Sequence, residues 1–473
     1  MAKTSPAILW FRRDLRLADH PALDALARSG RPIIPVFILD PLAAGYGAAP
    51  RFRLGLSLQS LSADLEAAGS RLILRRGTAL EVLKALVAET GATTVAWTRL
   101  YEAESVARDT KVKSALKERG IEARSYPGHV LFEPPSVETG QGGPYRVYTP
   151  FWKAVRNRDV ALPLPAPGRL PAPDVWPTGE PLEHWRMDAD MRRGADVVRP
   201  YLRVGEAAAR DRLGRFISEK VDAYAEGRNL LDHDACSGLS ENLAWGEISP
   251  AALWHAGRRA IEDDKTGAET FLKEVVWRDF AYHLAFHTPR LTSGNWRESW
   301  DRFPWSENGD SAEAIAWKRG RTGIEAVDAA MREMYVTGRM HNRGRMLVAS
   351  YLTKHLLTHW KIGLDWFADC LVDWDPASNA MGWQWSAGSG PDATPYFRVF
   401  NPETQAEKFD KAGRYRRAWI AEGQARPPQT ALGYFDATPQ SWGLSPSMTY
   451  PAPIVSAANG RARALAAYAA RDF

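Results

Sequence analysis

Short apolar runs alternate with amphipathic stretches through the first 126 residues of this 473-residue chain. The runs are rich in β-branched and aromatic residues, as strands are, and they lie at residues 7–11, 33–39, 72–74, 94–97 and 123–126. The stretches between them have helical spacing, at 21–29, 53–68, 79–90 and 103–119. Strand and helix alternating in this way predict a doubly wound parallel sheet, so this part belongs to the α/β class.

The usual phosphate-binding motifs are missing after the first predicted strand. The sequence FRRDLRLADHPAL stands where a GxGxxG fingerprint would follow, and the chain has no Walker loop. A doubly wound sheet does not by itself define a reaction. It predicts only that a ligand would lie beyond the carboxyl ends of the strands.

Beyond residue 126 the alternation stops, which predicts three parts with boundaries at 1–126, 127–200 and 201–473. Residues 127–200 contain too many prolines for long helices or central strands and are interpreted as a surface connector. The third part is expected to be helical, because apolar residues recur with a 3.6-residue period at 205–219, 250–263, 268–287, 323–337, 341–361, 366–371 and 457–470.

Composition restricts the class of protein. A hydrophobic content of 45% and a charged content of 25% are typical of a globular protein in water. Cys236 and Cys370 are the only cysteines, which excludes a disulfide framework and a four-cysteine iron–sulfur cluster. The sequence has no signal-peptide core and no apolar run of membrane-spanning length, so we expect a cytoplasmic protein without a membrane partner. The net charge of +5 does not decide between a nucleic-acid binder and an enzyme without such a partner.

Residues 337–402 combine many indoles with many polar groups of fixed geometry. Five tryptophans lie in this stretch beside histidine, asparagine, arginine and aspartate side chains. If the stretch begins as a helix, Asn342, Arg345 and Met346 share one face. An amide, a guanidinium and a thioether suit a flat heteroaromatic ligand that carries phosphate. The alternative is a tryptophan-rich core with arginines at its surface.

Two further segments have the same ambiguity. Glu274, Trp277 and Arg278 would share a helix face, either as a binding surface or as an intrahelical Glu–Arg pair beside a core indole. The CSGLS sequence at 236–240 offers hydroxyls and backbone N–H groups for phosphate, or it is an ordinary helix cap.

In this order, FRRDLRLADHPAL, FLKEVVWRDF, TGRMHNRGRM and DWDPASNAMGWQW resemble the photolyase/cryptochrome flavoprotein family over almost the whole chain. The resemblance implies an antenna-type domain at 1–126 and a helical domain at 201–473 that binds FAD. The positions matching the family's FAD-binding residues are Tyr224, Ser237, Leu239, Ser240, Arg278, Asn342, Arg345, Asp373, Asp375 and Asn379. Two positions depart from the pattern, since Gly238 stands where many members have arginine and Cys236 where many have threonine.

The resemblance also implies roles at a DNA lesion, with UV-damaged DNA as partner and no metal. Positions matching the pocket for a flipped pyrimidine dimer are Glu274, Trp277, Asn342, Met346 and Trp385, and a partly raised pKa is expected for Glu274. Positions matching the contacts with DNA are Arg228, Arg343 and Arg398, together with Trp277 and Trp385. Those matching the electron-transfer chain are Trp383, Trp360 and Trp305. For the arginines a solvated surface, and for the three chain tryptophans core packing, remain the alternatives.

Within the family, the pair His341-Asn342 and the amide of Asn379 resemble the photolyases that repair cyclobutane pyrimidine dimers, in the bacterial branch allied to plant cryptochromes (class III). A blue-light-sensing cryptochrome and a (6-4) photoproduct photolyase are the alternatives. An antenna chromophore is expected as well, methenyltetrahydrofolate rather than a deazaflavin, with no residue assigned to it. We expect a monomer.

Overall fold

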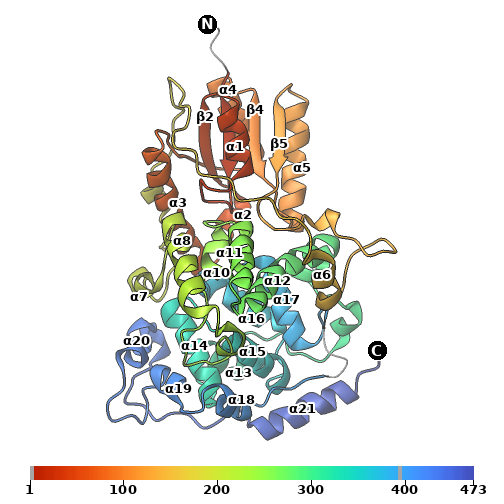
Figure 1. The fold of residues 1–473 in the computed structure, drawn as a ribbon. Helices are drawn as coiled ribbons and strands as arrows, with labels where there is room; N and C mark the ends of the chain where they lie inside the picture. Colours follow the sequence, from red (N-terminus) through yellow and green to blue (C-terminus); the bar gives the residue numbers. More distant parts are fainter. Residues whose placement is uncertain (1–4, 393–396) are drawn as a thin grey trace.

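The computed structural model describes residues 5–392 and 397–473, so residues 393–396 of the tryptophan-rich stretch lie outside it. Its first part is a five-stranded parallel sheet in the order β3-β2-β1-β4-β5. The strands are β1 Ala7–Phe11, β2 Ile33–Leu39, β3 Ile73–Arg76, β4 Thr94–Thr98 and β5 Glu122–Tyr126. The helices between them are α1 Pro21–Arg28, α2 Pro41–Ala44, α3 Ala48–Ala67, α4 Ala79–Thr90 and α5 Ala103–Lys117. The doubly wound sheet is thus confirmed (Figure 1).

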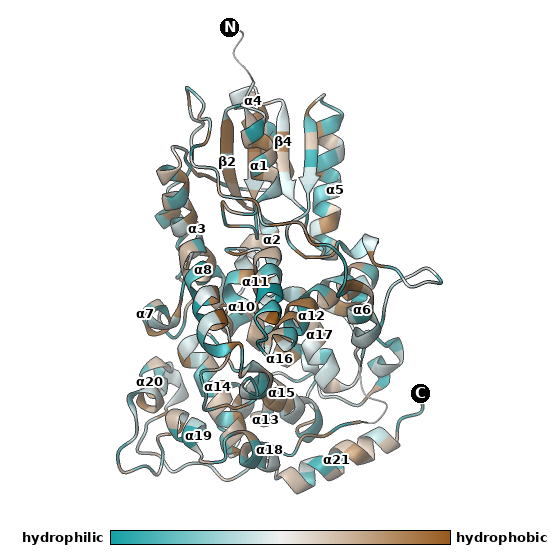
Figure 2. Ribbon diagram, in the orientation of Figure 1, coloured by the Kyte–Doolittle hydropathy of each residue, from teal (hydrophilic) through white to brown (hydrophobic). Residues whose placement is uncertain are grey.

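Apolar packing on both faces explains the continuous apolar runs of the central strands. Every residue of β1 and β2 is buried, and β2 is hydrophobic along its length (Figure 2). Trp10 of β1 is paired in register with Val36 of β2 and Trp97 of β4. A strand covered on two sides needs apolar residues at consecutive positions, which is why the sequence predicted these strands well.

The other α-helices of the described chain lie mostly below the sheet in Figure 1. They are α6 Tyr148–Val155, α7 Ala195–Val198, α8 Glu206–Arg215, α9 Tyr224–Gly227, α10 Ser240–Trp245, α11 Pro250–Glu262, α12 Ala268–His287, α13 Ala312–Lys318, α14 Glu325–Thr337, α15 Asn342–Ser350, α16 Trp360–Cys370, α17 Pro376–Ala387, α18 Pro402–Phe409, α19 Arg414–Trp419, α20 Gln429–Ala437 and α21 Ala457–Ala469. No helix of the described residues has both the length and the apolar character that a membrane span requires.

The single helix predicted for residues 341–361 is wrong in its extent. The α-helix ends at Ser350, a π-helical turn covers Tyr351–His355, and Leu357 adopts a left-handed conformation with φ of +49°. A residue far away in the sequence stabilises this break, because the Ser306 N–H donates to Leu357 O at 2.7 Å. A new helix, α16, then includes residues 366–370 of the separately predicted 366–371 segment.

The connector at 127–200 contains a helix that the sequence analysis did not predict. Helix α6 lies within it and packs on α12. Farther along, the Glu180 N–H donates to Leu74 O at 2.8 Å, so the connector runs along the edge strand β3. The high proline content concealed the amphipathic sequence YTPFWKAV, which forms α6.

The loop after β1 attaches the sheet to the helical part. The Arg13 Nε donates to Ala244 O at 2.8 Å, and the Leu15 N–H donates to Trp245 O at 3.1 Å. Gly246 ends α10 with φ of +68°, and a Cβ there would lie 2.1 Å from Arg13 O. The FRRDLRL sequence therefore docks on α10, and the carboxyl edge of the sheet becomes an interface.

A buried acid in α12 gives stability a pH dependence that can be tested. Asp279 is 1% exposed, and its Oδ2 accepts the N–H groups of Leu131 and Phe132, each at 2.8 Å. Burial raises the pKa of Asp279 to about 7, although these two N–H groups oppose the shift. The protonated Asp279 therefore contributes to the free energy of unfolding. This contribution is fully present below the pKa of the group in the unfolded chain, near 4, and is lost as the pH rises through its pKa in the folded chain, about 7.

We expect the Tm of the wild-type chain to fall more steeply between pH 5.5 and pH 8 than that of Asp279→Asn, because asparagine has no charge to bury. Thermal melts followed by circular dichroism measure the two curves. The exposed Asp211, replaced in the same way, is the control. Parallel curves for wild type and Asp279→Asn would contradict the assignment.

Candidate active site

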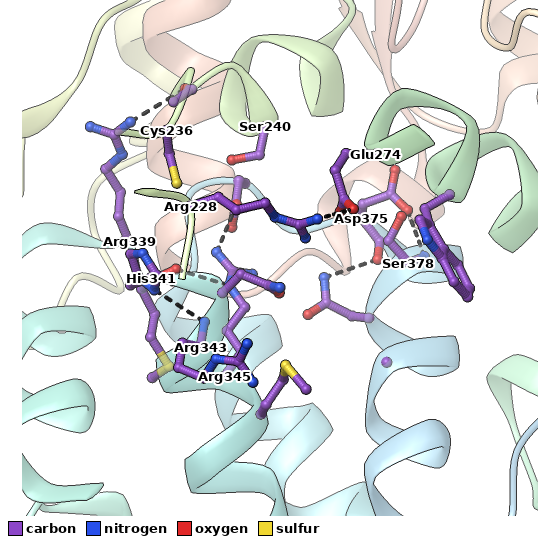
Figure 3. Close-up of a pocket in the computed structure, with 18 of the residues that line it drawn as sticks. Arg228, Cys236, Ser240, Glu274, Arg339, His341, Arg343, Arg345, Asp375 and Ser378 are labelled. Carbon is purple, nitrogen blue, oxygen red and sulfur yellow. Dashed lines mark hydrogen bonds and ion pairs between the residues drawn. The ribbon is translucent and has the colours of Figure 1, made fainter. Parts of the chain in front are cut away.

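A cavity of about 1780 Å³ lies in the helical part, between α10, α12, α15 and α17 (Figure 3). It is larger than a site for one drug-sized ligand requires. Most of the residues singled out from the sequence line it, from four separate segments of the chain: Tyr224, Arg228, Ser237, Leu239, Ser240, Glu274, Trp277, Arg278, Asn342, Arg343, Arg345, Met346, Asp373, Asp375, Asn379, Trp383 and Trp385. Trp305, Trp360 and Arg398 are not among its lining residues.

Helix α15 presents Asn342, Arg345 and Met346 to the cavity, as their spacing predicted. Arg345 pairs with a carboxylate at the cavity wall, because its Nη2 donates to Asp373 Oδ2 at 2.8 Å. Asp373 is 7% exposed, and its other carboxylate oxygen has no partner within the described residues. A buried carboxylate oxygen without a partner is costly, so this wall of the cavity is suited to a ligand that donates a hydrogen bond.

Asp375 anchors the helix that carries Asn379, Trp383 and Trp385. Its Oδ1 accepts the Ser378 N–H at 2.8 Å and caps α17, and the Asn379 side-chain amide donates to the Asp375 carbonyl at 3.0 Å. Asp375 and Asn379 are both buried, so their side chains are fixed relative to each other.

The charge of Asp375 is held by groups from distant parts of the chain. Arg13 Nη2 donates to its Oδ2 at 3.1 Å and the Tyr282 hydroxyl at 2.7 Å. Burial alone would raise the pKa of Asp375, but Arg13 and Arg278 outweigh it and lower the pKa. The sequence analysis did not assign Arg13 to the site. The only indication was a run of arginines directly after a buried strand.

Helix α12 presents Glu274, Trp277 and Arg278 to the same cavity, which confirms the shared face. The alternative of a pair between Glu274 and Arg278 is wrong. Arg228 instead pairs with Glu274 at 2.5 Å, so Arg228 lies inside the cavity and not on an open surface. Desolvation raises the pKa of Glu274, with Arg228 opposing, as the sequence analysis expected.

Arg278 is engaged by the connector. Its Nη1 donates to the His129 carbonyl at 2.6 Å, and its Nη2 lies 3.1 Å from His129 Nε2. Both terminal nitrogens therefore have partners that the sequence gave no reason to expect. The guanidinium is fixed beside Asp375, at 3.9 Å, which limits what else it can bind.

Tyr148 of α6 supports a cavity residue from behind, which the sequence analysis missed. Its ring stacks on Trp277 with centroids 3.7 Å apart and an interplanar angle of 8°. The Tyr148 hydroxyl donates to Lys273 O at 2.6 Å, which fixes the ring from α12 itself. One face of the Trp277 indole is thereby covered and the ring orientation is set. The aromatic run YTPFW in the connector was the available indication.

Arg343 and Arg398 differ in their surroundings. Arg343 lines the cavity, lies 4.2 Å over the Phe409 ring and donates to the Asn229 side chain. Arg398 is exposed and lies outside the cavity lining, where its carbonyl accepts from Lys354 Nζ at 2.5 Å.

The three tryptophans of the implied electron-transfer chain belong to one apolar cluster. Trp383 lines the cavity and packs on α16, because a Cβ at Gly363 would lie 2.1 Å from its ring. Trp360, fully buried on the same helix, donates its indole N–H to Asn295 Oδ1 at 2.8 Å. His359 lies between the other two rings, 5.3 Å from the centroid of Trp305 and 5.5 Å from that of Trp360.

Two family models match the chain. The model described as DNA photolyase matches residues 7–169, and the FAD binding domain of DNA photolyase matches residues 271–470. A deoxyribodipyrimidine photo-lyase of Agrobacterium fabrum is 46% identical over 99% of this chain and 98% of its own length.

Solved structures extend the match to the fold. A bacterial class III photolyase from Agrobacterium tumefaciens is 45% identical and superposes with a TM-score of 0.90, covering 99% of this chain and 98% of that one. A cryptochrome of Synechocystis, 29% identical, has a TM-score of 0.83 and covers 98% and 99% of the two chains. The α/β domain, the helical domain with its cavity and the matches over nearly the full length agree, and the chain belongs to the photolyase/cryptochrome family.

Proposed function

We propose that this chain is a deoxyribodipyrimidine photo-lyase, a light-driven DNA-repair enzyme that splits cyclobutane pyrimidine dimers. The observation that carries the proposal is the single cavity that combines the matched flavin positions with Glu274, Trp277 and Trp385. A carboxylic acid and two indoles are the groups expected around a flipped, nonaromatic pyrimidine dimer. The relative from Agrobacterium fabrum, at 46% identity, has this name.

The cavity fits FAD in its size and in the chemistry of its walls. The unpartnered Asp373 oxygen and the unpartnered Trp383 indole N–H offer an acceptor and a donor within the described lining. Arg345, Asp373 and Asn379 would border the flavin ring system, and Ser237 and Ser240 its phosphates. When bound, reduced and excited by light, FAD supplies the electron that opens the dimer.

The lesion would lie against α12 and α17. Trp277, held by Tyr148, and Trp385 are both half-buried and line the cavity. Glu274 can donate a hydrogen bond to a base carbonyl in its protonated form, which its raised pKa favours. Asn342 and Met346 would hold the bases from α15. A blue-light sensor that used the same flavin and tryptophan chain would not need these lesion-binding side chains.

We place an antenna-type domain at 1–126, the connector at 127–200 and the FAD-binding domain at 201–473. Trp383, Trp360 and Trp305 would pass electrons from the surface toward the cavity. The antenna chromophore is methenyltetrahydrofolate in this proposal, and the protein acts as a cytoplasmic monomer on UV-damaged DNA.

Repair itself is the test. The purified chain, reconstituted with FAD and photoreduced, is incubated with an oligonucleotide that carries one thymine cyclobutane dimer, in blue light and in darkness. Restoration of thymines in light alone is the expected result. A flavin-loaded, photoreducible protein that restores none would contradict the proposal and favour a sensor.

We expect Arg343→Ala to weaken binding to DNA of any sequence and to reduce the slope of log K against log salt by about 0.9, the value for one phosphate contact. Arg343 lies at the cavity wall with a neutral hydrogen-bond partner, so its charge is not compensated by that contact. Filter-binding titrations at several salt concentrations measure the slope. Arg215→Ala, on α8 and paired with Asp211, is the control. An unchanged slope would assign Arg343 to the solvated surface.

A further inference from the structure

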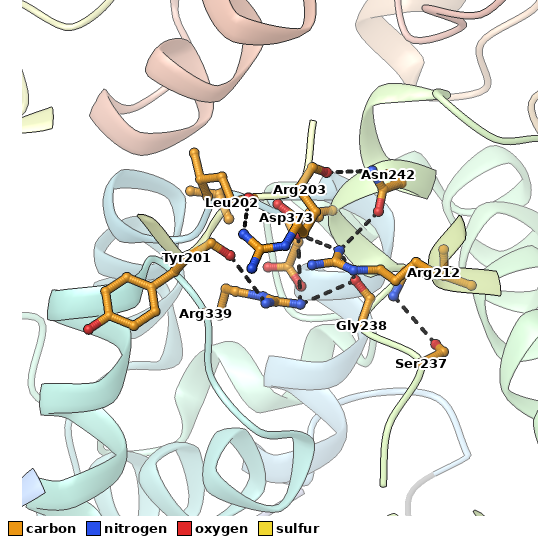
Figure 4. A network of polar contacts seen from close by, with 12 residues as sticks. Tyr201, Leu202, Arg203, Arg212, Ser237, Gly238, Asn242, Arg339 and Asp373 are labelled. Carbon is orange, nitrogen blue, oxygen red and sulfur yellow. Dashed lines mark hydrogen bonds and ion pairs between the residues drawn. The ribbon is translucent and has the colours of Figure 1, made fainter. Parts of the chain in front are cut away.

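The loop at 236–240 has a backbone turn at Gly238 that brings a carbonyl between two guanidinium groups. Gly238 has φ of +65°, a conformation that glycine adopts without strain. Its carbonyl accepts from Arg212 Nη1 at 2.6 Å and from Arg339 Nη2 at 3.3 Å (Figure 4). Neither arginine was assigned a function from the sequence.

The two arginines are held very differently. Arg212 also donates to Glu241 Oε1 at 2.5 Å and to Asn242 Oδ1 at 3.0 Å, and its side chain is 11% exposed. The further contacts of Arg339 are long, at 3.4 Å to Tyr201 O and 3.7 Å to Glu241, and its side chain is 32% exposed. Arg339 alone of the pair lines the cavity. It therefore retains hydrogen-bonding capacity for a ligand.

The charges around the loop do not balance. Three guanidiniums, of Arg53, Arg212 and Arg339, share two buried carboxylates, of Glu241 and Glu247. Arg53 binds both oxygens of Glu247, and Arg212 takes the nearest contact to Glu241. Among these five groups one positive charge is left over, and we assign it to Arg339, whose contact with a carboxylate is the longest.

The titration of Arg212 agrees with this excess of positive charge. Burial lowers the pKa of Arg212, Glu241 opposes that shift, and the neighbouring charge of Arg339 adds to it. An anion placed against Arg339 would relieve the repulsion between the two guanidiniums.

Two further acids line the cavity near this arginine. Burial raises the pKa of Glu333, and Arg339 is among the groups that oppose the shift, but within the described residues Glu333 forms no ion pair with Arg339 and accepts from the Tyr415 hydroxyl and the His341 N–H. Asp373 has Arg345 as its partner.

We propose that Arg339 binds the diphosphate of FAD, in the space that the missing side chain at position 238 leaves free. A Cβ at Gly238 would lie 2.7 Å from Arg339 Nη2, so a long side chain at 238 and the present position of Arg339 exclude each other. Arg278 cannot fully serve in its place, because His129 engages both of its terminal nitrogens. A guanidinium binds phosphate oxygens through two parallel hydrogen bonds, and Ser237 lies in the adjoining loop. This assignment rests on the proposed function, since it takes FAD as the ligand.

The test is equilibrium binding of flavins to the flavin-free full-length chain. Arg339→Gln is compared with wild type for FAD and for riboflavin, which has no phosphate, by flavin fluorescence at low and high salt. We expect the Kd for FAD to rise at least tenfold, as loss of a charge-assisted hydrogen bond predicts, with a weaker salt dependence and an unchanged Kd for riboflavin. Arg339→Lys keeps the charge, so its Kd for FAD should lie between those of the wild type and Arg339→Gln. Arg215→Gln is the matched control.

The outcomes separate the two proposals. A wild-type chain that fails to bind FAD would contradict the proposed function and this inference with it. A wild-type chain that binds FAD, with an Arg339→Gln variant of equal affinity and salt dependence, would overturn the inference alone, and so would an equal loss for riboflavin. Melting curves establish that the variants are folded. If Arg339→Gln does not fold, Arg339→Lys provides the test. A Kd for FAD and a salt dependence equal to those of the wild type would then contradict the inference, and a Kd clearly above that of the wild type would support it.

Discussion

The Glu274→Ala variant is expected to bind FAD like the wild type and to repair thymine dimers with a yield lower by about tenfold or more, the effect of removing a hydrogen bond to a developing charge. Glu274 is one helical turn from Trp277 and lines the cavity, and desolvation raises its pKa against the opposing charge of Arg228. Alanine removes the donor and leaves Arg228 without its acid. Glu269→Ala is the matched control, because Glu269 lies on the same helix in a largely exposed pair.

A second variant separates the hydrogen bond from the charge. Glu274→Gln keeps a donor at this position, so we expect its yield to lie between those of wild type and Glu274→Ala. A raised pKa means that Glu274 stays protonated to higher pH than an ordinary glutamate, and the wild-type yield should decline as the pH rises through that pKa. The glutamine variant should not show the decline. Unchanged repair by Glu274→Ala would remove Glu274 from the mechanism.

The sequence pattern correctly predicted those helices and strands whose ends are determined by residues close to them in the chain. β1, β2, α4 and α12 begin and end at the predicted residues. The two strands are continuous apolar runs because both faces of the sheet are covered. Helix α12 is buried along most of its length and stops before Pro289, which cannot continue a helix with full hydrogen bonding.

Elements set by distant contacts could not be predicted in this way. The break between α15 and α16 depends on Ser306, which contributes both an N–H and a carbonyl to it. Helix α17 lacks a clear apolar period, and its start was indicated only by Asp375 followed by proline, a cap and first-turn pair. Within the connector, prolines hid α6.

The same distinction holds for the candidate site. Spacing along α12 and α15 correctly placed side chains on one face, because that depends only on helix geometry. The choice of ionic partners was not predictable. Asp375 pairs with Arg13, 362 residues away, and Arg278 donates to the carbonyl of His129. Which charged residues of distant segments form pairs depends on the fold, so these pairs could not be predicted from the spacing of residues in one sequence.

The buried ion cluster at the base of the loop at 236–240 should produce the largest loss of stability. Arg53 of α3 is fully buried and donates to the two oxygens of Glu247 at 2.8 and 2.6 Å and to Glu241 at 3.3 Å. We expect Arg53→Met to lower the free energy of unfolding by about 3–5 kcal/mol, the cost of leaving buried charge uncompensated. Urea unfolding followed by circular dichroism measures it.

Arg51→Met tests whether burial is the cause. Arg51 lies on the same helix and pairs with the exposed Asp190, so its loss should cost less than about 1 kcal/mol. In Arg53→Met/Glu247→Gln the second change removes one of the two stranded charges, while Arg212 still pairs with Glu241, and part of the stability should return. A double variant as unstable as the sum of the single changes would contradict this electrostatic account. Because Glu241 also positions Arg212 beside Gly238, the Arg53→Met protein should in addition release FAD faster, which links the α3–α10 contact to the candidate site.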